Sequence, residues 1–370
     1  MPEVLFVAGE ASGDLHAAGV AAELRARAPA LTLVGVGGER MRAAGVELIE
    51  HTDRLAVMGF AEVVKHLPRH YRLLSALKRR VRGGGVGLLV LIDYPDFNMK
   101  LASAAKAAGV PVLYYITPQV WAWRPSRLAS LAKTVTRAAV ILQFEEPLLR
   151  AHGIDATFVG HPLLDRAHDL PDRTAARQSL GMPLDAPVLA LFPGSREQEI
   201  VRHLDDFVAS AREVERLVPG VRPVVSVAPG ITIPPGRCPY PLVAGSSFTV
   251  LRAANAALCK SGTTTLEAAV AGTPFVLTYR TSALTFAIGR RLVKVPYIGL
   301  VNWVAGRKLV PEFVQDELQP AAIARALATL FDASSAERSA MLDGLAEVRG
   351  RLGTPGAARR VADMAMAMLP

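Results

Sequence analysis

One stretch of the chain, from Leu251 to Arg280, restricts the possible fold more than any other. Its sequence, LRAANAALCKSGTTTLEAAVAGTPFVLTYR, predicts four elements in succession. These are a short strand over Ala256–Cys259, a polar turn over Ser261–Thr265, a helix over Leu266–Ala271 and a buried strand over Phe275–Tyr279. Strand, helix and strand of this kind make one βαβ unit, whose two strands run parallel. The chain is therefore predicted to contain a parallel sheet of the α/β class.

The polar turn of this unit has the composition of a phosphate site. Its backbone N–H groups and hydroxyls lie where a helix begins, so they point to one place near the positive end of that helix. Glu267 follows within the first turns, where a carboxylate can accept both hydroxyls of a ribose. The pair predicts a bound nucleoside diphosphate, although an ordinary helix cap with a helix-dipole partner would have the same sequence. The turn consists of Ser261, Gly262, Thr263, Thr264 and Thr265.

A second loop of the same kind lies earlier in the chain. PGSR, at Pro193–Arg196, follows a predicted strand over Val188–Phe192. Gly194 lets the chain turn close to a ligand, Ser195 offers a hydroxyl and an amide, and Arg196 can bind a diphosphate through two nitrogen atoms. Because both strands belong to one predicted domain, the two loops are expected to end on one crevice.

Strands and helices alternate along most of the remaining chain of 370 residues. The alternation stops in the polar segment 166–186, which predicts a linker, and the tail from residue 321 is alanine-rich and helical. A chain of this length exceeds one ordinary core and suits two domains. We therefore predict two Rossmann-like, doubly wound parallel-sheet domains. The predicted boundaries are 1–170 for the first domain, 171–345 for the second and 346–370 for a helical tail that packs on the first.

Composition excludes several classes of protein. Apolar residues make up 51% of the chain, but no apolar run approaches the roughly 20 residues that cross a bilayer. The first residues, MPEVLFVAGE, already predict a strand, and no signal peptide is evident. Cys238 and Cys259 fit a reducing cytoplasm and neither a disulfide framework nor a zinc site. A net charge of +9 predicts an anionic partner: nucleic acid, anionic lipid or a phosphorylated substrate.

Ionisable residues follow two strands of the predicted first domain. The turn GEASGD comes after the first strand, and DYPDFN comes after the strand that ends at Ile92. Open α/β sheets keep their sites at the carboxyl ends of strands, so each turn is a candidate for catalysis. Asp96 could equally cap the helix that follows it. The candidate residues are Glu10, Asp14, His16, Asp93 and Asp96.

Residues 57–82, VMGFAEVVKHLPRHYRLLSALKRRVR, combine an apolar stripe at near-helical spacing with many basic residues, and Pro68 interrupts the pattern. A basic amphipathic surface can lie in the interface of an anionic membrane. A helix that packs its apolar side on the protein's own sheet would show the same pattern. Both interpretations remain open at this point.

Taken together, the motifs closely resemble those of the lipid-A-disaccharide synthase family. The matching segments run in order from residue 9 to residue 317, so they cover nearly the full chain. The combination of GEASGD with VWAWR is specific. The segments are GEASGD, MGFAEV, DYPDFN, PQVWAWR, GHPLLD, PGSREQEI, SGTTTLEAAVAGTP and VNWVAGRKLVPEFVQDE.

The resemblance implies a glycosyltransferase of the GT-B type. Two Rossmann-like domains would face a central cleft, and the C-terminal helices would cross back to the first domain. The implied reaction is inverting and uses no metal or other cofactor. It joins UDP-2,3-diacylglucosamine to 2,3-diacylglucosamine 1-phosphate through a β-1,6 bond and releases UDP.

The resemblance also implies roles for individual residues. Arg196 and the turn Ser261–Thr265 would hold the diphosphate, and Glu267 would hold the ribose. Asp96 would take the proton of the acceptor's 6-hydroxyl, and Asn302, in LVNW, matches another position that the family needs. The rival bases are Asp93, Glu10, Asp14 and His16.

The implied lipid substrates change the weight of the earlier alternatives. They favour Met58–Arg82 as the element that docks a cytoplasmic enzyme peripherally on the inner face of the membrane. They leave no role for nucleic acid, for which no recognition module is present. The family can form a homodimer that exchanges C-terminal parts, and the helical tail permits this.

Two rival functions remain at the level of sequence. One is a different UDP-sugar enzyme, such as a UDP-N-acetylglucosamine 2-epimerase or the N-acetylglucosaminyl transferase of peptidoglycan synthesis. Those enzymes usually place two glycines after the serine of the diphosphate turn, where this chain has Gly262 and then Thr263. The other is a non-catalytic protein that binds a membrane or a nucleotide.

Overall fold

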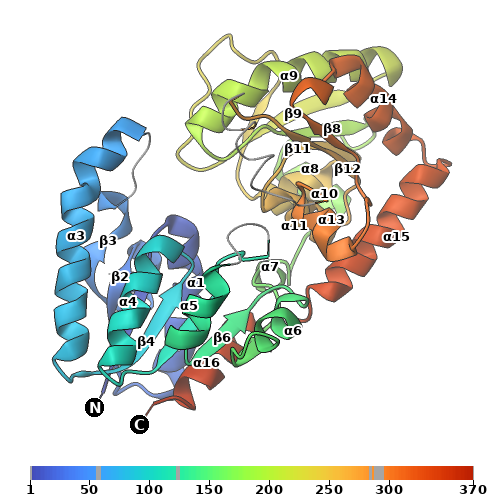
Figure 1. Cartoon of the computed structure of the whole chain (residues 1–370). Coiled ribbons are helices and arrows are strands. Elements are labelled where there is room, and N and C mark those ends of the chain that lie inside the picture. The colour runs from blue at the N-terminus through green and yellow to red at the C-terminus, as the bar shows by residue number, and fades with distance from the viewer. Residues whose placement is uncertain (1, 56–59, 122–125, 283–285, 287–295, 370) are drawn as a thin grey trace. The chain divides into compact units, whose positions relative to one another are not determined.

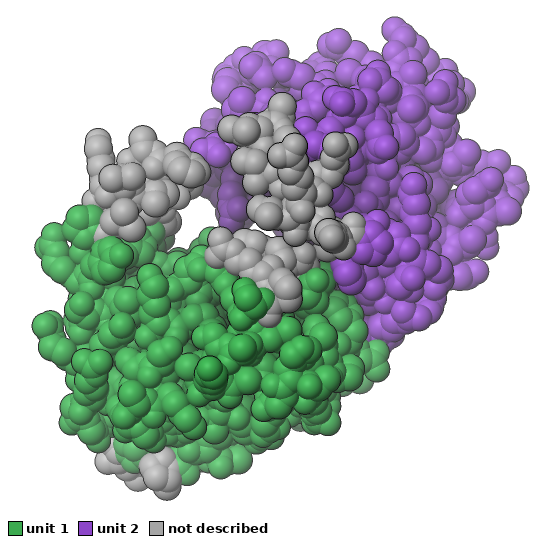
Figure 2. Space-filling model, in the orientation of Figure 1, with its two compact units in different colours: residues 1–165, 353–370 green, residues 166–352 purple. Residues whose placement is uncertain are grey.

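The computed structural model describes residues 2–55, 60–121, 126–282, 286 and 296–369, and of residues 60–67 the backbone alone. The chain forms two compact units (Figure 2). Unit 1 consists of Met1–Asp165 and Gly353–Pro370, and unit 2 of Arg166–Leu352. The sequence predicted these divisions at 170 and 345. Helix α15 (Ala336–Arg351) therefore lies wholly in unit 2, and only the last helix returns to unit 1.

Unit 1 contains a seven-stranded sheet in the order β3-β2-β1-β4-β5-β6-β7, in which all neighbouring strands are parallel. The edge strand β3 was not predicted, because its alternating glutamates and half-buried apolar residues are atypical of a buried strand. The strands are β1 (Glu3–Ala8), β2 (Thr32–Gly37), β3 (Glu47–His51), β4 (Val86–Ile92), β5 (Val112–Tyr115), β6 (Arg137–Val140) and β7 (Ala156–Phe158).

Helices cover both faces of this sheet (Figure 1). Successive residues of a strand point to opposite faces, so Leu5 and Val7 of β1 pack with α3, α4 and α5, whereas Phe6 packs with α1 and α16. The helices are α1 (Ala11–Arg27), α2 (Glu39–Ala43), α3 (Phe60–Arg82), α4 (Pro95–Ala107), α5 (Arg127–Thr134), α6 (Glu145–Arg150), α7 (Leu163–Arg166) and α16 (Ala357–Met366), with a 3₁₀ turn at Thr52–Arg54. The C-terminal helix thus completes the core of unit 1, as predicted.

Unit 2 repeats the plan with a six-stranded parallel sheet in the order β10-β9-β8-β11-β12-β13. Its strands are β8 (Val188–Phe192), β9 (Arg222–Val227), β10 (Leu242–Ala244), β11 (Ala256–Lys260), β12 (Phe275–Tyr279) and β13 (Glu312–Val314). Its helices are α8 (Arg173–Ser179), α9 (Glu197–Leu217), α10 (Ser247–Ala253), α11 (Thr264–Ala271), α13 (Leu300–Ala305), α14 (Pro320–Phe331) and α15, with a 3₁₀ turn at Gln315–Glu317. The prediction of two doubly wound Rossmann-like domains is confirmed.

Each sheet reverses its strand order at one place. In unit 1 the reversal lies between β1 and β4, and in unit 2 it lies between β8 and β11. Loops that leave the carboxyl ends of two such strands diverge to opposite faces of the sheet, and the crevice between them is where open α/β sheets bind ligands. The four motifs GEASGD, DYPDFN, PGSR and SGTTT follow these four strands.

The described half of α3 packs on the core of unit 1. Leu73, Leu74 and Leu77 are buried, whereas Tyr71 is 60% exposed. Pro68 lies inside the helix and does not end it. From residue 68 onward, α3 therefore follows the interpretation of a helix packed on its own sheet. The side chains of residues 60–67 lie outside the described residues. In the part of the chain that the structure describes, no helix is both long and apolar enough to span a bilayer.

Candidate active site

The PGSR loop of unit 2 is held by a half-buried ion pair. The amide of Ser195 donates to Glu199 Oε2 at 2.9 Å, and Lys260 Nζ donates to Glu199 Oε1 at 2.7 Å. Burial alone would raise the pKa of Glu199, but the bonds from Lys260 and from the Ser195 amide lower it, so the carboxylate is ionised at neutral pH. Lys260 ends β11, so this pair ties the loop after β8 to the neighbouring strand.

Arg196 is exposed and occupies the cap position before α9. The helix carries Glu197 and Glu199 in its first turn. One turn later, His203 lies buried between two backbone groups: its Nδ1 bonds the carbonyl of Glu199 at 2.8 Å, and its Nε2 accepts from the amide of Arg280 at 3.1 Å. Burial lowers the pKa of His203, so the ring is neutral with its proton on Nδ1.

The SGTTT turn lies at the start of α11, as predicted, and the helix begins at Thr264 instead of Leu266. Thr265 bonds the carbonyl of Gly262 through its hydroxyl at 2.8 Å, which leaves the turn tightly closed. The Ser261 hydroxyl donates to the carbonyl of Ile298 at 3.2 Å. The turn is thus connected to the segment that precedes α13.

Glu267 lies in the first turn of α11 and is only 6% exposed. Its Oε1 accepts from the guanidinium of Arg166 at 3.2 Å, and that guanidinium lies 5.4 Å from the centre of the Phe248 ring. Glu267 belongs to the element that follows β11, and Arg196 to the element that follows β8. Both therefore lie at the carboxyl edge of adjacent strands, as the prediction of a shared crevice requires.

Asn302 is fully buried in α13, and its side chain forms hydrogen bonds with neighbouring parts of unit 2. Its Oδ1 accepts from the amides of Leu309 and Val310, and its Nδ2 donates to the carbonyl of Val310 and to Glu312 Oε1. Glu312 in turn accepts from the amides of Ile298 and Gly299 at 2.9 Å each. Asn302 therefore shapes the segment that contacts Ser261, and a direct role for it in catalysis stays a prediction.

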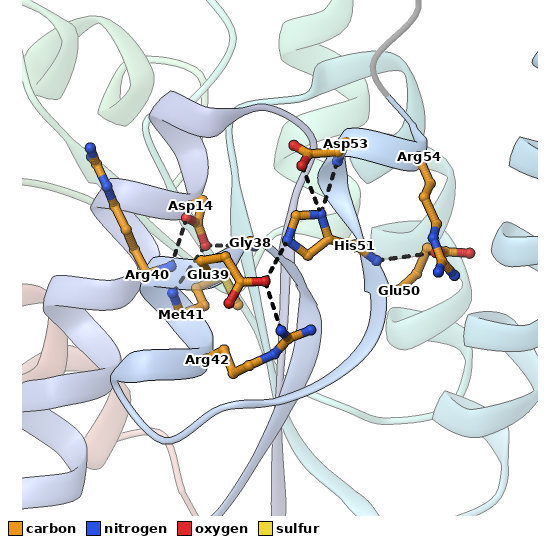
Figure 3. Close-up of polar contacts among 10 residues, drawn as sticks. All are labelled: Asp14, Gly38, Glu39, Arg40, Met41, Arg42, Glu50, His51, Asp53 and Arg54. Carbon is orange, nitrogen blue, oxygen red and sulfur yellow. Dashed lines mark hydrogen bonds and ion pairs between the residues drawn. The ribbon is translucent and has the colours of Figure 1, made fainter. Parts of the chain in front are cut away.

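In unit 1, Asp14 caps the start of α2 (Figure 3). Its carboxylate accepts from the amides of Gly38 at 2.6 Å, Met41 at 3.0 Å and Arg40 at 3.2 Å, and the residue is 5% exposed. Through these contacts Asp14 holds the first turn of α2 in place. Glu10 is exposed at the cap position of α1.

The DYPDFN turn has an unusual backbone. Asp93 and Tyr94 have φ values of 47° and 50°, a left-handed conformation that non-glycine residues adopt rarely. The ring of Tyr94 covers Gly9 so closely that a Cβ atom there would lie 2.2 Å from the ring. Glycine at the end of β1 and the left-handed pair at the end of β4 therefore depend on each other.

The two aspartates of this turn have different surroundings. Asp96, the predicted base, lies at the start of α4 with 75% of its side chain exposed, and it pairs with Arg127 of α5. Asp93 faces a cavity of about 240 Å³. Desolvation and the negative charge of Glu10 raise the pKa of Asp93, although the residue keeps contact with solvent.

This cavity opens at the carboxyl ends of β4, β5 and β6. Sequence reasoning missed one of its residues, Glu145, the first residue of α6. Trp121 donates to its Oε1 at 3.0 Å, and the amide of Leu142 donates to its Oε2 at 3.1 Å. The bond to Leu142 closes a turn just after β6, which ends at Val140. The cavity is lined by Asp93, Pro95, Ile116, Thr117, Pro118, Gln119, Arg127, Ile141, Leu142 and Glu145.

Burial raises the pKa of Glu145 from 4.5 to about 7, even though the bonds from Trp121 and Leu142 oppose the shift. The folded protein thus holds a proton that the unfolded chain has lost, so stability falls as pH rises from 4.5 to about 7. Relative to the Glu145→Gln variant, we expect the free energy of unfolding of the unaltered protein to fall by about 3 kcal/mol across this interval. Urea denaturation across the interval measures it, and a difference independent of pH would contradict it.

Among the described residues, no group of three or more histidine, cysteine, aspartate or glutamate side chains is arranged to hold a metal ion. The predicted absence of a metal from the reaction stays a prediction. The arginine of the VWAWR motif lies outside the described residues.

Comparisons with known proteins identify relatives that match the chain over nearly its full length. A family model described as lipid-A-disaccharide synthetase matches residues 4–346. The lipid-A-disaccharide synthase of Myxococcus xanthus (strain DK1622) is 43% identical over 377 residues, covering 100% of this chain and 98% of that protein. The lipid-A-disaccharide synthase of Syntrophus aciditrophicus (strain SB) is 40% identical, covering 99% of this chain and 97% of that protein.

Solved structures resemble the chain in fold alone. The glycosyltransferase of kitacinnamycin superposes with a TM-score of 0.64 at 17% identity, covering 100% of both chains. The UDP-GlcNAc 2-epimerase of Neisseria meningitidis superposes with a TM-score of 0.66 at 12% identity, covering 99% of this chain and 100% of that one. Neither rival function is favoured, since the two synthases are 43% and 40% identical to the chain whereas the epimerase is 12% identical.

Proposed function

We propose, from the premise that the chain belongs to the lipid-A-disaccharide synthetase family and is a glycosyltransferase of lipid A synthesis, that its two units divide the reaction. Unit 2 would hold the UDP group of the sugar donor, and unit 1 would hold the acceptor sugar. The observation that carries this division is the placement of the motifs. The phosphate-binding loops follow the reversal point of one sheet, and the carboxylates follow the reversal point of the other.

In the donor half, charge grows on the leaving diphosphate as its bond to the sugar breaks. Arg196 and the amides at the start of α11 would stabilise this charge, since a guanidinium can bind two phosphate oxygens and the helix adds its positive end. Lys260 and Glu199 keep the loop of Arg196 in place. With these groups the reaction needs no metal, and Glu267 would accept the ribose hydroxyls.

In the acceptor half, we assign the general base to Asp93 in preference to Asp96. The 6-hydroxyl oxygen attacks the anomeric carbon of the donor, the bond from that carbon to the phosphate oxygen breaks, and its electron pair leaves with UDP. Asp93 takes the hydroxyl proton. Its raised pKa suits this step, because a base works best when its pKa lies near the working pH. The Asp96 carboxylate is already paired with Arg127.

The assignment is tested with purified protein, UDP-2,3-diacylglucosamine and 2,3-diacylglucosamine 1-phosphate. Mass spectrometry should detect UDP and a disaccharide 1-phosphate in equal amounts. Consumption of UDP-N-acetylglucosamine without acyl chains, and of no acylated donor, would overturn the lipid substrate.

The lipid substrates require access to a membrane surface, and α3 is the proposed docking element. Its described part approaches the DYPDFN turn, because the centre of the His70 ring lies 6.4 Å from that of the Tyr94 ring. Basic residues remain exposed on its outer side, including Arg72, Arg79 and Arg82. Together with the apolar residues of 58–67, they would hold the enzyme peripherally on the cytoplasmic face of an anionic membrane. A homodimer remains a further prediction.

We expect the triple substitution of Val63, Val64 and Leu67 by serine to move the protein from the membrane fraction to the soluble fraction. Loss of apolar surface from an interfacial helix weakens its binding to lipid. Leu74 belongs to the same apolar stripe but is left unchanged, because it is buried in the core and serine there would destabilise unit 1. Sedimentation with anionic vesicles measures the change.

The control for this experiment is Val201→Ser, which removes an apolar side chain that is 72% exposed on unit 2. It should sediment with vesicles as the unaltered protein does. Equal sedimentation of the triple variant and the unaltered protein would refute docking through α3.

A further inference from the structure

The packing of Tyr114 in the core of unit 1 does not require its hydroxyl group. The residue is fully buried in β5, where phenylalanine would fill the same space. A buried hydroxyl costs free energy unless it forms a hydrogen bond, and here it donates to a backbone atom of the DYPDFN turn. The Tyr114 hydroxyl donates to the carbonyl oxygen of Asp93 at 2.8 Å.

The same oxygen receives a second bond. Asn98, fully buried in α4, donates through Nδ2 to the carbonyl of Asp93 at 2.7 Å, with longer contacts to the carbonyls of Ile92 at 3.3 Å and Val7 at 3.4 Å. Its Oδ1 is buried and accepts no hydrogen bond from the described part of the chain. The side-chain amide of Asn98 therefore acts through its Nδ2 donor, and its shortest hydrogen bond is the one to the carbonyl of Asp93.

These two bonds act at a strained position. Asp93 and Tyr94 both have positive φ, a conformation that persists only where the surrounding structure enforces it. The Tyr94 ring is fixed separately, against Gly9 and stacked on Phe97 at 5.1 Å between ring centres. The carbonyl of Asp93 is held by Tyr114 and Asn98. Holding this carbonyl holds the backbone of Asp93, and with it the direction of the Cα–Cβ bond from which the carboxylate extends.

The geometry points to Tyr114 as a positioning residue of the transfer reaction, which acts with Asn98 through the backbone of Asp93 and aims its carboxylate into the cavity. This inference rests on the proposed role of Asp93 as the base. Tyr114 itself touches neither substrate. A base must reach the proton that it removes within hydrogen-bond distance, so a small rotation of the turn lowers the rate of the chemical step.

The test is a double-mutant cycle of Tyr114→Phe and Asp93→Asn. Tyr114→Phe removes one oxygen atom and leaves the ring in place, so the protein should keep its melting temperature to within a few degrees. We expect kcat to fall by about 10-fold to 100-fold, with the KM for the UDP-sugar unchanged, because unit 2 is untouched. In the Asp93→Asn background the same substitution should have almost no further effect on kcat. Tyr114 acts only through the position of the Asp93 carboxylate, and that carboxylate is absent from this background.

Tyr115→Phe is the matched control. Tyr115 is the next residue of β5, is equally buried and packs on the opposite face of the sheet with α1 and α16. It should leave kcat unchanged. An effect of Tyr114→Phe that multiplies with that of Asp93→Asn, or an effect equal to that of Tyr115→Phe, overturns the inference. If Asp93→Asn alone has full activity, the proposed base is wrong and the inference falls with it.

Discussion

The Asp93→Asn variant is expected to lose about 10³-fold in kcat and to bind UDP as the unaltered protein does. Asparagine keeps the size of the side chain and cannot take a proton, so the acceptor hydroxyl must attack without a base. The turn should survive, because Tyr114 and Asn98 hold its backbone and the Tyr94 ring packs on Gly9. The side-chain oxygen of asparagine can still accept from the amide of Tyr94, as the carboxylate does. Steady-state kinetics and calorimetry with UDP measure the two quantities separately.

Asp96→Asn is the matched comparison, three residues away in the same motif. Its carboxylate is mostly exposed and pairs with Arg127, so its removal should lower kcat by less than about 10-fold through a looser α4–α5 contact. If Asp96→Asn causes the large loss and Asp93→Asn the small one, the base is Asp96, as the family resemblance implied at the level of sequence.

The pH dependence of kcat/KM adds a second measurement on Asp93. A base must be ionised, so activity falls as pH drops through its pKa. Because desolvation and Glu10 raise the pKa of Asp93, this fall should begin at a higher pH than for an ordinary aspartate. Glu10→Gln removes one cause of the shift and should move the fall toward lower pH. An unchanged profile would show that Glu10 does not act on the base.

The parts of the site that were predictable from sequence are those that a short segment determines. The βαβ unit around Ser261, the loop of Arg196 and the turn of Asp93 each follow one strand, and parallel strands bring their carboxyl ends to one edge. Local patterning therefore located the loops. It does not distinguish the surroundings of Asp93 from those of Asp96, because the partner of Asp96 is Arg127 of α5, from a distant part of the chain.

The remaining differences have the same cause. Glu145 is the first residue of the short helix α6, and its raised pKa comes from burial, which the bond from Trp121 only partly offsets. Sequence spacing does not show that burial. Asn302 resembles a catalytic residue by motif, yet its hydrogen bonds are all spent on the backbone around Val310 and on Glu312. Leu74 fits an apolar membrane stripe by periodicity and is part of the core. In each case a tertiary contact decides the role.

Gly194→Ala is expected to raise the KM for the UDP-sugar by about 100-fold. Gly194 has a φ of 148°, which side chains rarely allow, and a Cβ atom there would lie 2.4 Å from the Cβ of Glu199. Glu199 cannot yield easily, because it holds both Lys260 and the amide of Ser195. The loop must therefore move by roughly 1 Å, and a shift of that size carries Arg196 away from the diphosphate.

Gly245→Ala separates this effect from backbone strain. Gly245 has a similar φ of 137° in the same unit, but a Cβ atom added there would have no other atom within 4 Å. Both variants should lose stability through backbone strain, because both force a side chain into the same region of conformation, and Gly194→Ala should lose more through its clash with Glu199. Only Gly194→Ala should lose affinity for UDP in calorimetry, and its kcat at saturating donor should stay close to that of the unaltered protein. If both variants bind UDP equally well, the loop of Arg196 does not hold the diphosphate, and the donor site must lie on other residues of unit 2.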